Sequence, residues 1–419
     1  MTEASEQAAP AERELTALTT PADGVPPVID TPHALAEACA RFAAGVGPVA
    51  ADAERASGFR YGQATYLAQF KREGAGIALI DAAALPDLTS LGAALGDAEY
   101  VFHAASQDLP GMHDLGLYPA SIFDTELAAR LLGWPKVGLA AVVERELGLV
   151  LAKEHSAQDW STRPLPHDWL NYAALDVEVL LELRVSMGEQ LTAAGKAEWA
   201  RQEFEAVRLA PAPEPRIDPW RRTSGTHLLR DSRSLAIVKS LWEARDIAAR
   251  ERDTSPGRVL RDAAITAAAQ AKPQSVDALV EVSEWRSRGT KRRAAYWYPF
   301  IEQAMALPED QLPPRRGPSA DGPPQPRMWK EKRPEAAERL NAARVGIGVL
   351  VDTLAIPAEN LLQPDALRRA CWDYSGGGEE WVRELLASRG ARPWQIDLCA
   401  PVLVAAFEAP APAEPIPAE

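Results

Sequence analysis

The sequence predicts an α/β domain with a mixed sheet flanked by helices, followed by two small all-α domains. Within residues 27–208, three strand-like runs follow one another and then alternate with helical stretches. Residues 226–305 and 329–408 show helical patterns throughout, and Pro-rich stretches separate the three parts. The chain has 419 residues. At about 150 residues per domain, this length suits two or three domains.

The strands of the first domain come before most of its helices. Three strand-like runs in a row, followed by alternation with helices, indicate a sheet with both antiparallel and parallel neighbours. The expected strands are "GPVAADAE" (47–54), "ATYLAQF" (64–70), "GIALID" (76–81) and "YVFHAAS" (100–106). Helices are expected through "LPDLTSLGAAL" (85–95) and through residues 124–133, 138–147 and 167–190.

The two later domains share one order of elements. Each opens with a long helix, followed by a short Leu/Ala-rich helix, a Gly-containing turn and a final apolar helix. This order predicts a divergent internal repeat.

Four further segments divide or end the chain. Residues 209–225 and 306–328 are rich in Pro, which does not sustain a helix, so both are predicted to be linkers. Residues 1–26 and 409–419 are predicted to be disordered, because they are polar or Pro-rich and lie at the ends of the chain.

Composition excludes several classes of protein. With 47% hydrophobic and 25% charged residues, the chain is typical of a globular protein, and it contains no apolar run long enough to span a membrane. The N-terminus is acidic and lacks the pattern of a secretory signal. Cys39, Cys371 and Cys399 lie far apart and form no CxxC pair. This favours a reducing cytoplasm and argues against a disulfide framework or a zinc site.

The net charge of −14 argues against binding of nucleic acid by bulk electrostatics, although basic surface can be confined to one part of the chain. Residues 226–303 contain 14 Lys or Arg and 10 Asp or Glu, and "WRSRGTKRRAAYWYPF" (285–300) interleaves five basic residues with aromatic ones. Such a stretch can bind phosphates and stack on bases. Alternatively, its aromatic residues form a core and its basic residues are solvated. We expect an aromatic core beneath a basic face.

Four carboxylates of the first domain can converge. Asp52 and Glu54 are two residues apart on a strand, so both lie on one face of the sheet, where like charges need a cation or raised pKa values. Asp108 follows the fourth strand, and Tyr172 and Asp176 lie one helical turn apart. Taken singly, each has an ordinary explanation: a surface D-x-E, an Asp that complements a helix dipole, and a packed tyrosine beside a solvated charge.

Together, the four acids predict two divalent cations. Two metal ions about 3.5–4 Å apart can stabilise both the attacking and the leaving oxygen of a phosphodiester. Carboxylate oxygens suit Mg²⁺ or Mn²⁺ and do not suit Zn²⁺. The hydroxyl of Tyr172 would then lie beside the metals and could hold the attacking water by a hydrogen bond.

At this point the chain resembles the ribonuclease D family of DEDD exonucleases across about residues 45–185, and its Y-x-x-x-D motif resembles the tyrosine subclass. The resemblance rests on the order, spacing and flanking residues of "DAE" (52–54), "HAASQD" (103–108), "IFDTELAARLLG" (122–133), "DWSTRPL" (159–165) and "YAALD" (172–176). It implies a ribonuclease H-like fold, metal ligation by Asp52, Glu54, Asp108 and Asp176, and water orientation by Tyr172. It also implies hydrolysis from the 3′ end that releases nucleoside 5′-monophosphates.

The histidine subclass is the alternative for the last motif, because His103 and Asp108 spell H-x-x-x-x-D. That assignment would confine the nuclease core to residues 52–108, which is too short for the sheet and its helices. It would also leave "YAALD" unexplained, and the residue five positions before the last carboxylate is Asn171, which is not histidine.

Trp160 and Arg163, which precede the helix that carries Tyr172, each have two possible roles. Arg163 could bind a phosphate or pair with an acid, and Trp160 could stack on a base or pack against the helix that carries Tyr172.

Residues 226–305 resemble the HRDC domain in "LAIVKSLWEARDIAARERDTSPGRVLRD", and residues 329–408 resemble a weaker second copy. The HRDC domain is associated with nucleic-acid binding.

The resemblance therefore implies a cytoplasmic, metal-dependent 3′→5′ exoribonuclease that acts on structured RNA, with tRNA precursors the family-level expectation. A DNA exonuclease is the first alternative, because the chemistry does not read the sugar unless the 2′-OH is contacted. A non-catalytic RNA-binding scaffold is the second; it would be expected to have lost a carboxylate or the tyrosine, and none is lost.

Overall fold

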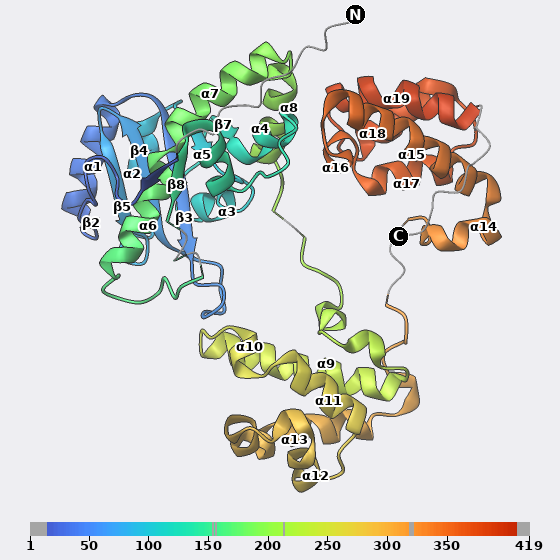
Figure 1. Ribbon diagram of the computed structural model, residues 1–419. Helices are drawn as coiled ribbons and strands as arrows, with labels where there is room; N and C mark the ends of the chain where they lie inside the picture. Colours follow the sequence, from blue (N-terminus) through green and yellow to red (C-terminus); the bar gives the residue numbers. More distant parts are fainter. Residues whose placement is uncertain (1–14, 153–154, 156, 213, 318–321, 409–419) are drawn as a thin grey trace, which may run out of the picture.

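The computed structural model describes residues 15–152, 155, 157–212, 214–317 and 322–408. Its main feature is a six-stranded sheet in the order β2-β5-β4-β3-β6-β7 (Figure 1). The central strands β3, β4 and β5 are antiparallel neighbours, whereas β6 and β7 continue parallel to β3. This confirms the predicted mixed sheet. The strands are β2 (Val28–Ile29), β3 (Val46–Arg55), β4 (Thr65–Glu73), β5 (Gly76–Asp81), β6 (Glu99–Phe102) and β7 (Ser121–Asp124).

Helices flank this sheet, as predicted. Helix α6 packs over β3, β4 and β5, and α8 packs against β7. The helices of this part are α1 (Pro32–Ala44), α2 (Thr89–Leu95), α3 (Leu109–Asp114), α4 (Thr125–Leu131), α5 (Leu139–Leu147), α6 (His167–Glu178), α7 (Leu180–Ala193) and α8 (Ala197–Arg208).

The predicted disorder of residues 1–26 is wrong for residues 15–26, while residues 1–14 and the tail 409–419 lie outside the described part. Strand β1 (Thr16–Leu18) pairs in parallel with β8 (Leu149–Leu151). Asn171 Nδ2 also donates to Thr19 O over 2.7 Å. A three-residue strand is too short to show periodicity in the sequence, and its order comes from a partner about 130 residues away.

The two helical regions repeat one order of helices, as the sequence pattern predicts. A long helix is followed by one of 4 residues, one of 10 residues, a further short helix and a final long helix. The first region contains α9 (Ser232–Glu251), α10 (Pro256–Val259), α11 (Asp262–Ala271), α12 (Val276–Glu281) and α13 (Arg288–Ala306). The second contains α14 (Trp329–Lys332), α15 (Pro334–Leu354), α16 (Ala358–Leu361), α17 (Pro364–Asp373), α18 (Gly378–Ser388) and α19 (Pro393–Glu408).

Aromatic residues form the core of the first helical region. Trp285 and Trp297 are 0% and 1% exposed, which supports the core interpretation for these two residues. Trp220, in the 3₁₀ helix Pro219–Arg222, is also buried and packs in the same cluster. The predicted linker 209–225 therefore does not extend to its expected end, because a single tryptophan anchors its second half to α9.

The second helical region is docked on α8. The carboxylate of Glu203 accepts hydrogen bonds from Arg392 and from the indole N–H of Trp394, and the rings of Trp199 and Trp394 stack at 4.9 Å. Lys196 Nζ donates to Leu354 O over 2.7 Å. Removing this region would expose apolar surface and leave the Glu203 carboxylate without the guanidinium of Arg392.

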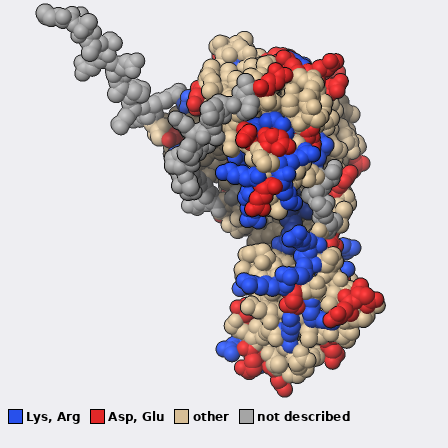
Figure 2. All heavy atoms as spheres, turned by 90° about the vertical axis from the view of Figure 1, so that its right-hand side faces the viewer, with Lys and Arg blue, Asp and Glu red and all other residues tan. Residues whose placement is uncertain are grey.

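Lys and Arg side chains gather in the middle of the face that Figure 2 shows, with some acidic side chains among them. Basic surface is therefore concentrated despite the negative net charge.

Among the described residues, no helix is long and apolar enough to cross a membrane. Cys39, Cys371 and Cys399 are free thiols in the structure.

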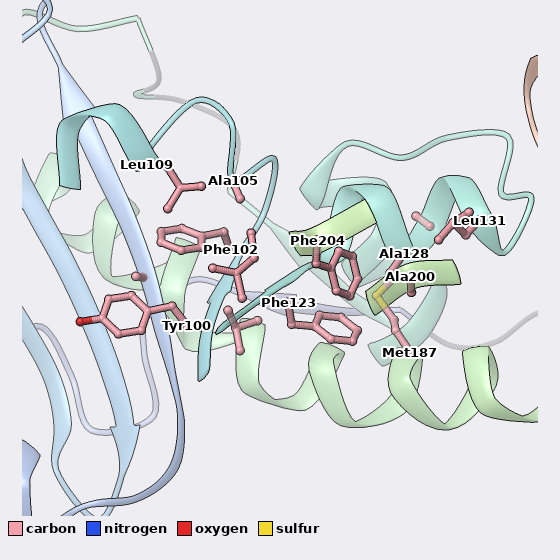
Figure 3. Packing of buried hydrophobic residues seen from close by; sticks show 14 of the residues in the cluster. Tyr100, Phe102, Ala105, Leu109, Phe123, Ala128, Leu131, Met187, Ala200 and Phe204 are labelled. Carbon is pink, nitrogen blue, oxygen red and sulfur yellow. The ribbon is translucent and has the colours of Figure 1, made fainter. Parts of the chain in front are cut away.

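The core beside the site joins β6 and β7 to the helices behind them. Figure 3 shows Tyr100 and Phe102 of β6 near Phe123 of β7, which packs against Phe204 of α8 with ring centroids 4.9 Å apart. Phe102 and Met187 are fully buried. This packing holds the end of β6 in place, and the chain turns there towards Asp108.

Candidate active site

Strand β3 carries the first two carboxylates in the middle of the sheet. Its alternation places Asp52 and Glu54 on one face, while Ala51 and Ala53 are buried on the other. Because β3 pairs with β4 on one side and β6 on the other, its backbone is held along both edges.

Helix α6 brings the third carboxylate over that face of the sheet. Oxygen atoms of Asp52, Glu54 and Asp176 all lie within 4.8 Å of one another, a spacing that can hold a metal ion. Tyr172, one turn before Asp176, lines the same pocket, and its hydroxyl lies beside the Asp176 carboxylate.

Asp108 lies at the wall of the same pocket, outside this group of three. It occupies the N-cap position of α3, but its side chain makes no cap hydrogen bond, so it does not cap this helix. Its turn is held by Asp124, which is 2% exposed. The carboxylate of Asp124 accepts N–H bonds from Ala104 and Ala105 at one end and from Glu126 and Leu127 in α4.

The pocket has a volume of about 700 Å³ and is lined by all five residues that the sequence singled out. Further lining residues went unnoticed in the sequence, because nothing in their local pattern marks them. They include Ser57, Gly58 and Phe59 in the loop after β3, Gln107, Leu139 and Gln158. The loop could have been suspected from its position directly after the D-x-E strand. His103 also lines the pocket, and its Nδ1 lies 2.8 Å from Thr125 Oγ1.

Burial raises the pKa of every carboxylate of the site. Desolvation raises the pKa of Asp52 to about 6, although a hydrogen bond from the Ala53 backbone N–H lowers it in part. Desolvation and the neighbouring acids raise the pKa of Glu54 to about 10 and that of Asp108 to about 9. The pKa of Asp176 is also raised, first by burial and then by Asp52. Without a cation, the folded site resists carrying its full negative charge.

Trp160 and Arg163 have structural roles. Trp160 is fully buried and packs under α6 with Leu67 and Leu79. The guanidinium of Arg163 forms two hydrogen bonds of 2.6 Å to the Asp81 carboxylate. The alternatives of a base-stacking tryptophan and a phosphate-binding arginine are therefore not supported.

Comparison with known families matches three parts of the chain. Residues 26–192 match a family described as 3′-5′ exonuclease, and residues 234–301 match the HRDC domain. Residues 322–407 match a family described as 3′ to 5′ exonuclease C-terminal domain, so the second helical region is covered by a family of its own.

A full-length relative decides the family. Ribonuclease D of Acidiphilium cryptum is 32% identical over 403 residues, which cover 89% of this chain and 97% of the relative. The chain belongs to the ribonuclease D family. Ribonuclease D of Escherichia coli is 33% identical over 253 residues, covering 58% of this chain and 65% of the relative. The membership makes the protein a 3′–5′ exoribonuclease with an RNA substrate, as predicted.

Solved structures agree with this membership. A protein from Bifidobacterium adolescentis is 41% identical with a TM-score of 0.86, and the match covers 94% of this chain and 100% of that one. The structure titled "Escherichia coli RNase D, an exoribonuclease involved in structured RNA processing" is 28% identical with a TM-score of 0.63 and covers 87% of this chain and 96% of that one. The predicted fold, an exonuclease domain followed by helical domains, is confirmed for the ribonuclease D family.

Proposed function

We propose that Asp52, Glu54, Asp108 and Asp176 hold two divalent cations, Mg²⁺ or Mn²⁺, and that Tyr172 positions the attacking water. The observation that carries the proposal is the convergence of oxygens from Asp52, Glu54 and Asp176 within 4.8 Å, with Asp108 on the wall of the same pocket. Among the described residues, no Lys or Arg forms an ion pair with any of these four acids. A buried acidic group of this kind fits hard cations.

When bound, the cations would supply a polarised water and would neutralise charge on the phosphodiester. The protein residues have separate tasks. The strand and helix hold the carboxylates in one arrangement, and Tyr172, which lies beside Asp176, presents its hydroxyl to the pocket. Burial also raises the pKa of Tyr172, so at neutral pH its hydroxyl keeps its proton and can donate a hydrogen bond.

The proposed reaction removes nucleotides from the 3′ end of RNA and releases nucleoside 5′-monophosphates, with structured RNA such as tRNA precursors as the substrate. Support comes from family membership and from the basic residues of the first helical region. The scaffold alternative is disfavoured because all five expected residues line one pocket. A contact to the 2′-OH would exclude the DNA alternative, which therefore needs a direct test.

A degradation assay on matched RNA and DNA oligonucleotides of one sequence tests this function. With Mg²⁺, we expect 5′-labelled RNA to shorten stepwise from its 3′ end, with 5′-monophosphates among the products. DNA should be degraded more slowly. Faster degradation of DNA would favour the DNA exonuclease, equal rates would show that the enzyme does not distinguish the two sugars, and intact RNA after prolonged incubation would favour the scaffold.

The metal assignment predicts how stability depends on pH. In the unfolded chain these carboxylates titrate near pH 4, whereas in the folded site Asp52 titrates at about 6 and Glu54 at about 10. Between these values the folded state binds more protons, so the metal-free protein loses stability as pH rises. Bound cations require ionised ligands, so their stabilising effect grows with pH.

We therefore expect Mn²⁺ to raise the thermal unfolding temperature more at about pH 8.5 than at about pH 5.5. Thermal denaturation with EDTA and with saturating Mn²⁺ measures the difference. Asp176→Asn is the control and should reduce the difference between the Mn²⁺-induced shifts at the two pH values. An equal shift at both pH values would show that the ions bind elsewhere.

A further inference from the structure

A second cavity of about 840 Å³ lies in the first helical region, between the α10–α11 segment and the start of α13. Arg258, Arg261 and Arg293 line it. Glu284 is the one acidic residue of its described lining, so positive charge dominates. All three arginines are exposed, and no ion-pair partner is found for them among the residues that the structure describes. Their charge is therefore available to a ligand.

The wall of this cavity also offers neutral hydrogen-bond donors. Trp297 lines it and is 1% exposed, yet its indole N–H has no acceptor among the described residues. The described residues thus leave this buried donor unsatisfied, which is costly. The first turn of α13 borders the cavity at Gly289 and Thr290, and a Cβ atom added to Gly289 would meet open space. Backbone N–H groups of a first helical turn favour anions.

Arg258 connects this cavity to the catalytic pocket. Its Nε donates to Gly58 O over 2.8 Å, and its guanidinium lies over the ring of Phe59 at 4.0 Å. Gly58 and Phe59 both line the catalytic pocket, whereas Arg258 lines the second cavity. One arginine therefore touches the rims of both cavities. In Figure 1 the loop after β3 extends towards α10, the helix that contains Arg258.

Further contacts fix the relative position of the two cavities. Ser255 N donates to Phe59 O over 2.8 Å, and Tyr61 N donates to Asp253 Oδ1 over 3.2 Å. The hydroxyl of Tyr61 donates to Asp246 Oδ1 over 2.9 Å and lies 3.1 Å from Arg250 Nη2. The loop after β3 is thus clamped by the end of α9 and by α10, so the second cavity stays beside the catalytic pocket.

From this arrangement we infer that the second cavity is a phosphate-binding subsite for the single-stranded RNA segment that lies 5′ to the cleaved nucleotide. The inference rests on the proposed function, because it assigns the RNA 3′ end to the catalytic pocket. The strand leaves that pocket over Gly58 and Phe59, passes Arg258, and places a backbone phosphate between Arg261 and Arg293. Contacts of this kind bind the RNA backbone and do not select for a base sequence.

Two variants of the full-length protein test the subsite: Arg261→Ala and Arg293→Ala. Arg292→Ala is the matched control, since Arg292 is an exposed arginine of the same helix α13 and does not line the cavity. Affinity for a fluorescent single-stranded RNA of about 20 nucleotides is measured in EDTA at several salt concentrations. We expect each test variant to bind several-fold more weakly, with a salt slope smaller by about 0.7, the value for one phosphate contact on a single strand.

Cleavage of a dinucleotide with Mg²⁺ is the second readout, because a dinucleotide is too short to occupy both cavities. It should proceed at the wild-type rate in all three variants. The inference is overturned if Arg261→Ala and Arg293→Ala bind long RNA as Arg292→Ala does, or if dinucleotide cleavage falls together with binding. A wild-type protein that cleaves no RNA while the binding difference persists would instead count against the proposed function and leave the subsite supported.

Discussion

Asp52→Asn and Asp176→Asn should each abolish hydrolysis while the protein stays folded. Both residues contribute to the group of three carboxylates, and an amide offers a neutral oxygen where the site needs a charged ligand. We expect a loss larger than the about 10²–10³-fold that follows removal of one donor to a transition state. Single-turnover cleavage of labelled RNA at saturating Mg²⁺ measures it.

The same variants should not lower the thermal stability of the metal-free protein, and they can raise it. The pKa of Glu54 and that of Asp176 are both raised in part by the charge of Asp52, so removing that charge relieves repulsion. Asp168→Asn is the matched control, because Asp168 lies on the same helix as Asp176, has a side chain that is 64% exposed and does not line the pocket. A near wild-type rate for either test variant would contradict the metal assignment, as would loss of folding in both.

The local geometry of the candidate site was predictable because it depends on periodicity. Alternation along a strand places Asp52 and Glu54 on one face, and one helical turn aligns Tyr172 with Asp176. Periodicity placed Asp108 only as a residue after a strand end, and its expected role as a ligand came from the family resemblance. The turn that leads to Asp108 is held by Asp124 through Ala104 and Ala105, and these contacts across about 20 residues are not revealed by any period.

The parts that could not be predicted depend on contacts between distant segments. Trp220 looks like a linker residue in a Pro-rich sequence, but it is buried against α9. The contact between Arg258 and the loop at Gly58 joins residues that lie 200 positions apart. Charge and composition indicated that residues 226–303 carry basic surface, but they could not show that this surface adjoins the catalytic pocket. Since the second helical region is also docked through Glu203 and Arg392, point variants are better tests here than truncations.

Tyr172→Phe should separate the chemical step from metal binding. The substitution keeps the ring and its packing, including the edge-on contact with His155, and removes only the hydroxyl. Because the carboxylates are unchanged, Mn²⁺ affinity should remain close to that of the wild type. A positioned group of this kind contributes about 10²–10⁴-fold to the rate, and we expect a loss in that range in single-turnover cleavage.

Apparent RNA affinity should hardly change, since an interaction made mainly in the transition state lowers the rate without weakening substrate binding. Tyr118→Phe is the matched control, because Tyr118 is 71% exposed and does not line the pocket. Mn²⁺ titration and single-turnover kinetics on both variants give the two readouts separately. If Tyr172→Phe cleaves at the wild-type rate, its hydroxyl does not position the water, and Tyr172 serves only to pack one turn before Asp176. If instead Mn²⁺ affinity falls in parallel with the rate, the Tyr172 hydroxyl acts by holding Asp176 in place as a ligand.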